Sequence, residues 1–208
     1  MIRLLEFHRS PNCAKVRIGL RFKGLDFETE ELSAADRSPL REAANWPLVP
    51  VLLDGRVSMR ESEAILHYLE SNYREGPSLT PDSADGIREG EAAVLEARWR
   101  LRPILRKVYG LVMRPAEERD LSLLQGLPVH LREALAPVDR ALEGKDFLLG
   151  ERMSLYDVVL ACALLPLRPN PLYAAQSPIW AFFGEHLSLP DGVPHVAPWV
   201  DRVAAHDA

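Results

Sequence analysis

The sequence predicts an α+β half followed by an all-helical half, and three observations carry this prediction. Up to residue 73, short apolar runs of strand length alternate with stretches in which apolar residues recur at helical spacing. Residues 76–82, Gly-Pro-Ser-Leu-Thr-Pro-Asp, then form a break rich in turn-forming residues. Beyond this break, apolar residues recur almost throughout with a spacing of three and four. We therefore expect two domains, at residues 1–76 and 84–208.

The first half combines short strands with three helices. Strands are predicted at 2–7, 26–32, 51–53 and 56–58, and helices at 11–23, 38–44 and 61–73. Gly24 ends the first helix, and Asp54-Gly55 is a hairpin signal between the last two strands. The resulting order, βαβ followed by ββα, is that of a thioredoxin-like domain.

The second half is expected to be an all-α helical domain. Helices are predicted at 84–113, 117–142, 155–167, 179–186 and 198–205. We expect Pro103 to kink the first of them and Pro128 and Pro137 to disturb the second, because proline lacks the N–H that a helix interior needs. Ser154 and Asp157 have the spacing of a capping box at the start of the third. We interpret this pair as structural, without a chemical role.

The turn Ser10-Pro11-Asn12-Cys13 follows the first strand directly and opens the first helix. Ser10 occupies the expected N-cap, and Pro11 the first helical position, where its missing N–H costs nothing. A hydroxyl there lies among unpaired backbone N–H groups and the positive end of the helix dipole, which can hold an anion such as a thiolate. On these four residues alone, a plain helix cap is the better interpretation.

Two later segments change that balance. Val49-Pro50 precedes the third strand, and a cis bond there would turn the Val49 amide outward. Glu61-Ser62 opens the helix that ends the first half, with Ser62 as the expected cap and anion site. Glu61 beside it offers a carboxylate for an ammonium group, so the pair suits an amino-acid head group. The alternative is a helix cap next to a solvated acid.

Composition excludes several classes of function. The chain is 47% hydrophobic and 26% charged, as is usual for a globular protein. Its formal net charge of −5 argues against a nucleic-acid partner and against binding to anionic membranes. The basic run from Arg98 to Lys107 is interpreted as a solvated helix face. The longest apolar run, residues 158–167, is too short to span a bilayer.

Cysteine and histidine usage narrows the expectations further. The two cysteines, Cys13 and Cys162, make no disulfide framework, and no leader precedes the first strand, so a cytoplasmic protein is expected. No histidine has a Cys or His partner at zinc spacing, so no metal is expected. Neither GxGxxG nor GxxxxGK occurs, which argues against a dinucleotide fold and a P-loop.

In this order and spacing, the serine turn, Val49-Pro50, Glu61-Ser62 and the capping box resemble the cytosolic glutathione transferase superfamily over nearly the whole chain. Ser10-Pro11-Asn12-Cys13 is most similar to the serine-type branch with the zeta, theta and delta classes and many bacterial members. The resemblance implies a glutathione transferase in which Ser10 is the catalytic residue and glutathione the co-substrate. The thiolate would attack a small electrophile by conjugation, isomerisation or dehalogenation.

The resemblance also implies a binding mode. Glu61 and Ser62 would hold the γ-glutamyl head, Val49 and Pro50 the cysteinyl backbone, and Ser10 the sulfur. The electrophile would lie between the halves, with lining candidates Trp99, Tyr109 and Met113, for which a helical core or dimer contact is the competing interpretation. A homodimer is implied, paired through the helices at 61–73 and 84–113.

One departure and two alternatives accompany this resemblance. Where the family often has Asn-Pro-x-Gly-x-Val-Pro, this chain has Asn45-Trp46-Pro47-Leu48-Val49-Pro50, so a proline replaces the glycine. The first alternative is a non-catalytic interaction protein with this fold, of the stringent-starvation-regulator type. The second is glutathione-dependent thiol–disulfide exchange through Cys13.

Overall fold

A computed structural model describes residues 1–207 of the 208-residue chain. Its first half contains one four-stranded mixed sheet in the order β2-β1-β3-β4. The strands are β1 Ile2–Glu6, β2 Phe27–Glu31, β3 Val51–Asp54 and β4 Val57–Arg60. β1 runs parallel to β2 and antiparallel to β3, and β3 runs antiparallel to β4. The predicted thioredoxin-like order of elements is confirmed.

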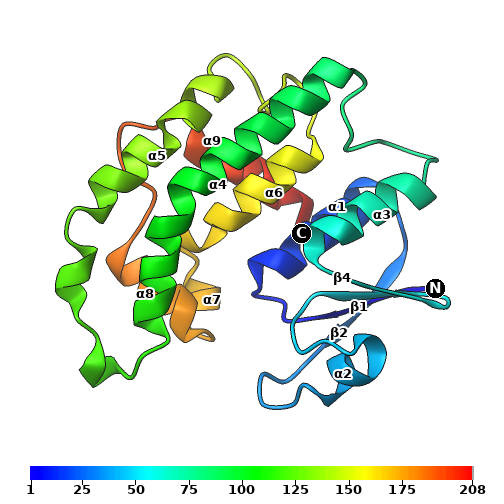
Figure 1. Ribbon diagram of the computed structural model, residues 1–208, viewed down its shortest axis with the longest axis horizontal. Coiled ribbons are helices and arrows are strands. Elements are labelled where there is room, and N and C mark those ends of the chain that lie inside the picture. The colour runs from blue at the N-terminus through cyan, green and yellow to red at the C-terminus, as the bar shows by residue number, and fades with distance from the viewer. Residues whose placement is uncertain (208) are drawn as a thin grey trace.

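Three helices flank this sheet: α1 Pro11–Phe22, α2 Ser38–Ala44 and α3 Ser62–Asn72. α1 and α3 cover one face, and α2 lies against the other (Figure 1). Adjacent residues of β1 serve the two faces, because successive side chains of a strand point in opposite directions. Leu4 packs with Val16 and Ile65 beneath α1 and α3, whereas Leu5 packs with Leu40 of α2.

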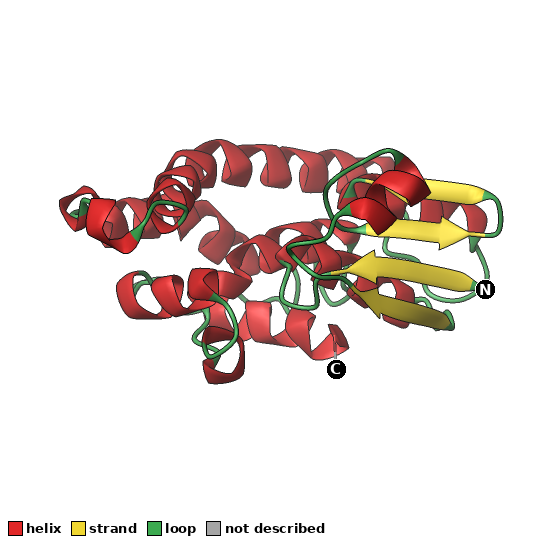
Figure 2. Cartoon of the chain, turned by 90° about the horizontal axis from the view of Figure 1, so that it is seen from below, coloured by secondary structure: helices red, strands yellow, loops and turns green. Residues whose placement is uncertain are grey.

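The second half is a helical domain beside the sheet (Figure 2). Its helices are α4 Ala84–Val112, α5 Leu127–Leu142, α6 Leu155–Leu164, α7 Pro171–Ala174, α8 Pro178–His186 and α9 Val196–Ala204. Short 3₁₀ turns occupy 116–118, 121–124, 165–167 and 205–207. The main core lies among these helices and extends to Ala14 and Ile18 of α1, so the two halves pack directly on each other.

Several sequence-based bounds need correction. The helix expected at 117–142 begins only at Leu127, after the two 3₁₀ turns at 116–118 and 121–124. Pro128 lies in the first turn of α5, where proline is tolerated, so it helps to start the helix it was expected to disturb. α4 continues through Pro103. The four-residue helix α7 was not predicted.

Candidate active site

The sheet register gathers the predicted site residues at one end of the sheet. The end of β1 lies beside the start of β3, with Leu5 opposite Val51. The start of β3 in turn lies beside the end of β4, with Val51 opposite Arg60. Three segments therefore meet at the same end of the sheet. Ser10 lies in the segment after β1, Val49-Pro50 in the segment before β3, and Glu61-Ser62 in the segment after β4.

Ser10 is the N-cap residue of α1 in backbone terms, but its hydroxyl does not cap the helix. Its φ and ψ are −76° and 123°, and its carbonyl accepts from the N–H groups of Cys13 and Ala14 at 2.9 and 3.0 Å. The side chain makes no capping hydrogen bond. It is half-buried and lies within hydrogen-bonding reach of the Cys13 thiol. The interpretation as a plain cap therefore does not describe what this hydroxyl does.

Cys13 is fully buried beneath the turn. Burial raises the pKa of its thiol to about 12, although hydrogen bonds from the Phe7 backbone and the Ser10 side chain act in the opposite direction. A reactive cysteine needs an accessible thiolate. This environment favours a neutral packing side chain and gives no support to disulfide exchange through Cys13.

The bond between Val49 and Pro50 is cis, one of the two isomers that the sequence left open. Pro50 is buried and leads into β3, and Val49 is half-buried. Within residues 1–207, neither the Val49 N–H nor its carbonyl has a hydrogen-bond partner. Half-buried backbone groups normally find a partner, so this residue offers both a donor and an acceptor to a ligand.

The start of α3 differs from the expectation that Ser62 caps the helix. Glu61 occupies the N-cap with no side-chain capping bond, and Ser62 is the first helical residue. Glu61 has φ 69° and ψ 112°, an unfavourable backbone conformation for a residue with a Cβ. Ser62 is 7% exposed, and none of the hydrogen bonds identified in residues 1–207 involves its hydroxyl, which is not among the fully enclosed polar atoms without a partner. The strained turn thus presents a free hydroxyl next to the free N–H groups of the helix start.

Charged side chains of three helices meet beside this turn. Glu63 of α3 forms an ion pair with Arg98 of α4, and its Oε1 lies 3.9 Å from Nζ of Lys15 in α1. Lys15 donates to Oδ1 of Asn12 at 3.0 Å. Burial lowers the pKa of Lys15, which the Glu63 carboxylate partly offsets. These contacts fix the starts of α1 and α3 relative to α4.

The expected lining of an electrophile pocket is only partly in place. Trp99 of α4 and Met113, the residue after α4, are 83% and 74% exposed, so they line no enclosed pocket. Tyr109 packs against Phe183 of α8, with ring centroids 5.2 Å apart. The best-defined cavities of the described residues are lined by other side chains and do not include Ser10, Val49, Glu61 or Ser62.

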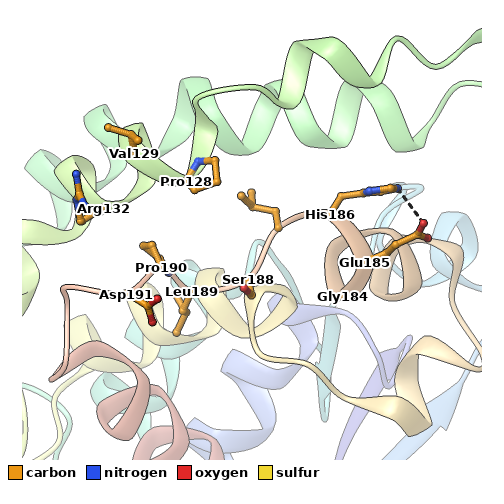
Figure 3. Close-up of a pocket in the computed structure, with 11 residues that line it drawn as sticks. Pro128, Val129, Arg132, Gly184, Glu185, His186, Ser188, Leu189, Pro190 and Asp191 are labelled. Carbon is orange, nitrogen blue, oxygen red and sulfur yellow. Dashed lines mark ion pairs between the residues drawn. The ribbon is translucent and has the colours of Figure 1, made fainter.

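A cavity of about 420 Å³ lies elsewhere, between the start of α5 and the segment after α8 (Figure 3). Its polar side chains are those of Arg132, Glu185, His186, Ser188 and Asp191. In Figure 3 the His186 ring points toward Glu185, and the two lie 3.7 Å apart. This cavity is confined to the helical half and adds nothing to the site at the end of the sheet.

The capping box at Ser154 and Asp157 is confirmed as a structural device. Oδ2 of Asp157 accepts from the backbone N–H and the hydroxyl of Ser154 at 2.8 and 2.6 Å. Oδ1 accepts from the Leu148 N–H at 2.8 Å and from Nε1 of Trp199 at 2.9 Å. Burial raises the pKa of Asp157, and these four hydrogen bonds oppose that rise. Sequence spacing indicated the Ser154 contact but not the Leu148 and Trp199 contacts, which come from distant segments.

Membrane-spanning helices and metal clusters are both absent from the described part of the chain. Among the helices of residues 1–207, none has both the length and the apolar character to cross a membrane. In the same range, no group of three or more His, Cys, Asp or Glu side chains is arranged to hold a metal ion.

Comparison with known families identifies both halves of the chain. Residues 4–78 match the model of the glutathione S-transferase N-terminal domain, and residues 122–202 match that of the C-terminal domain. The chain belongs to the cytosolic glutathione transferase superfamily. The first match contains Ser10, Val49-Pro50 and Glu61-Ser62, and the second contains the capping box.

Two relatives illustrate the similarity, which is low in identity and spans the whole of this chain. Glutathione S-transferase U1 of Arabidopsis thaliana is 24% identical over 210 residues, which span 100% of this chain and 86% of that protein. Maleylacetoacetate isomerase of Pseudomonas aeruginosa is 27% identical over 215 residues, with coverages of 100% and 93%.

Solved structures of superfamily members share the fold. The tau class glutathione S-transferase of mango, Mangifera indica, has a TM-score of 0.74 at 23% identity, covering 98% of this chain and 88% of that one. The theta class enzyme of Xanthomonas axonopodis pv. citri, solved with glutathione bound, has a TM-score of 0.70 at 24% identity, with coverages of 97% and 91%.

Proposed function

We propose that this superfamily member is a glutathione transferase that activates the glutathione thiolate with Ser10. The observation that carries the proposal is a half-buried Ser10 hydroxyl that caps nothing, at the start of α1. It lies at the same end of the sheet as the unpaired Val49 backbone and the free Ser62 hydroxyl. The names of the relatives support the reaction class, and the glutathione bound to the theta class enzyme supports glutathione as ligand.

The proposed chemistry needs no general base. A free thiol has a pKa of about 8.5, and each unit by which the site lowers it corresponds to about 1.4 kcal/mol of preferential binding of the anion. The thiol proton goes to solvent, and the Ser10 hydroxyl donates a hydrogen bond to the sulfur anion. A sulfur lone pair then forms a bond to the electrophilic carbon. In a displacement the bond to the leaving group breaks, and the leaving group departs with the bonding pair. In an addition the π bond of the substrate breaks, and its electron pair stays on the substrate and takes a proton from solvent.

Replacing Ser10 tests the catalytic role. Ser10→Ala should leave the melting temperature unchanged, because the hydroxyl caps nothing, and should reduce turnover far more than glutathione affinity. The ultraviolet absorbance of bound thiolate, followed against pH, measures the activation directly. Ser83→Ala is the matched control: Ser83 does cap α4, accepting from the Gly86 N–H at 3.0 Å. That variant should lose about 1 kcal/mol of stability and keep its activity. Unchanged turnover in Ser10→Ala would move the chemistry elsewhere.

The γ-glutamyl position has its own test. Charge-assisted hydrogen bonds contribute about 1.5–3 kcal/mol, so Ser62→Ala should weaken glutathione binding at least several-fold in calorimetry. Ser71→Ala serves as control, because Ser71 lies on the same helix and its hydroxyl donates to the His67 carbonyl at 2.8 Å. Equal affinity in Ser62→Ala and the unmodified protein would remove Glu61 and Ser62 from the site.

A panel of electrophiles then selects between conjugation, isomerisation and dehalogenation. The isomerase among the relatives makes a maleyl-type acid one member of that panel. Absence of any glutathione binding would instead favour the non-catalytic interaction protein.

A further inference from the structure

The turn that carries Ser10 is held by residues from the far end of the chain. The Trp180 Nε1 of α8 donates to the Arg9 carbonyl at 2.9 Å, and the Arg9 side chain donates to Oε1 of Gln176 at 3.0 Å. The His8 N–H donates to the Glu31 carboxylate at 2.7 Å. Arg9 is thus held through both its carbonyl and its side chain. His8 is held through its N–H and, as described next, through its carbonyl.

Arg17 is the centre of this arrangement. It lies two helical turns after Ser10 on α1 and is 1% exposed. Its guanidinium pairs with Glu6, the last residue of β1, and donates to the His8 carbonyl at 3.0 Å. It also binds both carboxylate oxygens of Asp207, at 2.7 and 2.6 Å. One side chain therefore joins the end of β1, the turn before Ser10 and the 205–207 turn.

The charges in this network alternate. Glu6 and Asp207 flank Arg17. Arg21 is the second cation beside Asp207, because it donates to Oδ1 of Asp207 at 2.7 Å and to its carbonyl at 2.8 Å. Two cations balance two anions, which a mostly buried network requires. Figure 1 shows the end of the chain lying beside α1. Without Asp207, the guanidinium would keep Glu6 and the His8 carbonyl but lose its only bidentate partner among the described residues.

We propose that Arg17 and Asp207 are positioning residues, which fix the β1–α1 turn so that the Ser10 hydroxyl is aimed at the glutathione sulfur. This inference rests on the proposed function of Ser10. Misplacement of a reacting group by about 1 Å can cost on the order of 100-fold in rate, so a turn clamped by a buried bidentate pair has a direct catalytic consequence. Neither residue touches glutathione in this scheme, because both act through the backbone of His8.

The test measures the thiol pKa of bound glutathione in Asp207→Asn. We expect a rise of at least about half a unit, which reduces the thiolate about threefold at a pH below both values. The kcat should fall at least as much, while KM for glutathione stays within about twofold, because the Glu61-Ser62 turn is untouched. A purely structural role would change the melting temperature and leave the thiol pKa unmoved.

Asp201→Asn is the matched control. It breaks the ion pair between Asp201 of α9 and Arg168, which ties the same tail but does not reach α1. It should alter neither the thiol pKa nor kcat. Arg21→Gln provides a milder variant on the surface, since it removes the second cation of Asp207 and leaves Arg17 paired. It should shift the thiol pKa in the same direction by less, and it keeps the test available if Asp207→Asn does not fold.

The outcomes separate this inference from the proposed function. If the unmodified protein and Ser10→Ala hold glutathione at the same thiol pKa, the role of Ser10 fails and the positioning role fails with it. If Ser10→Ala raises the thiol pKa but Asp207→Asn and Arg21→Gln, both folded, do not, only the positioning role is overturned.

Discussion

At the scale of single residues, Asp157 shows how one buried carboxylate joins three segments. Its two oxygens accept from Ser154 at the start of α6, from Leu148 in the preceding loop and from Trp199 of α9. The spacing of Ser154 and Asp157 predicts the local part of this cluster because a capping box is a sequence-local device. The contacts with Leu148 and Trp199 depend on tertiary packing, which local spacing does not encode.

We expect Asp157→Ala to lower the free energy of unfolding by at least about 2 kcal/mol, because it removes a cap and leaves buried donors unpaired. Thermal unfolding measures the loss. Activity per folded molecule should stay near normal at a temperature well below the transition. Asp157→Asn keeps the shape and one acceptor oxygen, so its loss should be smaller. A variant that is fully stable but inactive would contradict the structural role.

Ser10 and Ser62 show that residue type alone does not determine which serine caps a helix. Ser10 and Ser62 are both preferred cap residues, and in the structure neither hydroxyl caps its helix. The residue type alone therefore favoured the wrong local role in both cases. At Ser10 the order of motifs along the chain predicts another role, because the family resemblance implies a functional turn there, and that role stays a prediction. At Ser62 the backbone of Glu61, with its positive φ, moved the start of the helix by one residue.

At the scale of elements, the break at 76–82 is tied back to α3 through Glu70. This carboxylate accepts from Nζ of Lys23 at 3.0 Å, from the Ser78 hydroxyl at 2.7 Å and from the Leu79 N–H at 3.2 Å. The sequence predicted the break from its turn-forming residues and did not indicate the ties. The domain bounds 1–76 and 84–208 stay a prediction.

The hydrogen bonds to Glu70 make the stability of the fold depend on pH. Burial alone would raise the pKa of Glu70, but the hydrogen bonds from Ser78, Lys23 and Leu79 hold it below its ordinary value of 4.5. Because the pKa is lower in the folded state, ionised Glu70 stabilises the fold above pH 4.5, and this contribution is lost as the pH falls through the folded value. Denaturant unfolding should therefore show Glu70→Gln less stable than the unmodified protein at pH 7, with a gap that narrows as the pH falls below 4.5. A gap independent of pH would contradict the assignment.

Helix starts and ends followed the sequence where local signals were strong. The short helix at 38–44 was predicted with its bounds, and Gly24 follows α1 with a positive φ of 67°. The region before α5 was predicted poorly, because its leucines and acids have helical spacing but form 3₁₀ turns. Neither 3₁₀ turn has a buried residue, and local features break the helix here: the Asp120 side chain accepts from the Ser122 N–H, and Gly126 has a positive φ of 78°.

At the scale of the whole molecule, α4 leaves apolar surface uncovered. Many apolar residues of α4 lie in the core of this chain, among them Val94, Leu101, Ile104, Val108, Leu111 and Val112. Leu95 and Trp99, one turn apart, are 71% and 83% exposed. They lie next to Arg98, whose partner Glu63 belongs to α3. The exposed apolar surface therefore lies on α4 beside its contact with α3. These are the two helices through which the superfamily resemblance implies pairing.

We therefore expect a homodimer in which a two-fold interface buries Leu95 and Trp99 of both chains. Light scattering at micromolar concentration should give about twice the chain mass of 23.3 kDa. Trp99→Glu should shift the equilibrium toward the monomer, because it places a charge in the apolar centre of the interface. Leu172→Glu, on α7 at a residue that is 73% exposed, controls for a general effect of surface charge. A monomer at these concentrations for the unmodified protein would refute the expectation.

The pairing of Arg17 with Asp207 also has a consequence during synthesis. The two residues are 190 positions apart, so the bidentate pair waits until residue 207 has left the ribosome. At about 5–20 residues per second, roughly 10–40 s pass between the synthesis of Arg17 and that of Asp207, and during this time Glu6 and the His8 carbonyl are the partners that the guanidinium has within the first half. The sheet half therefore emerges first, with its tie to the 205–207 turn still missing. Translation sets the earliest moment at which the Arg17–Asp207 pair forms.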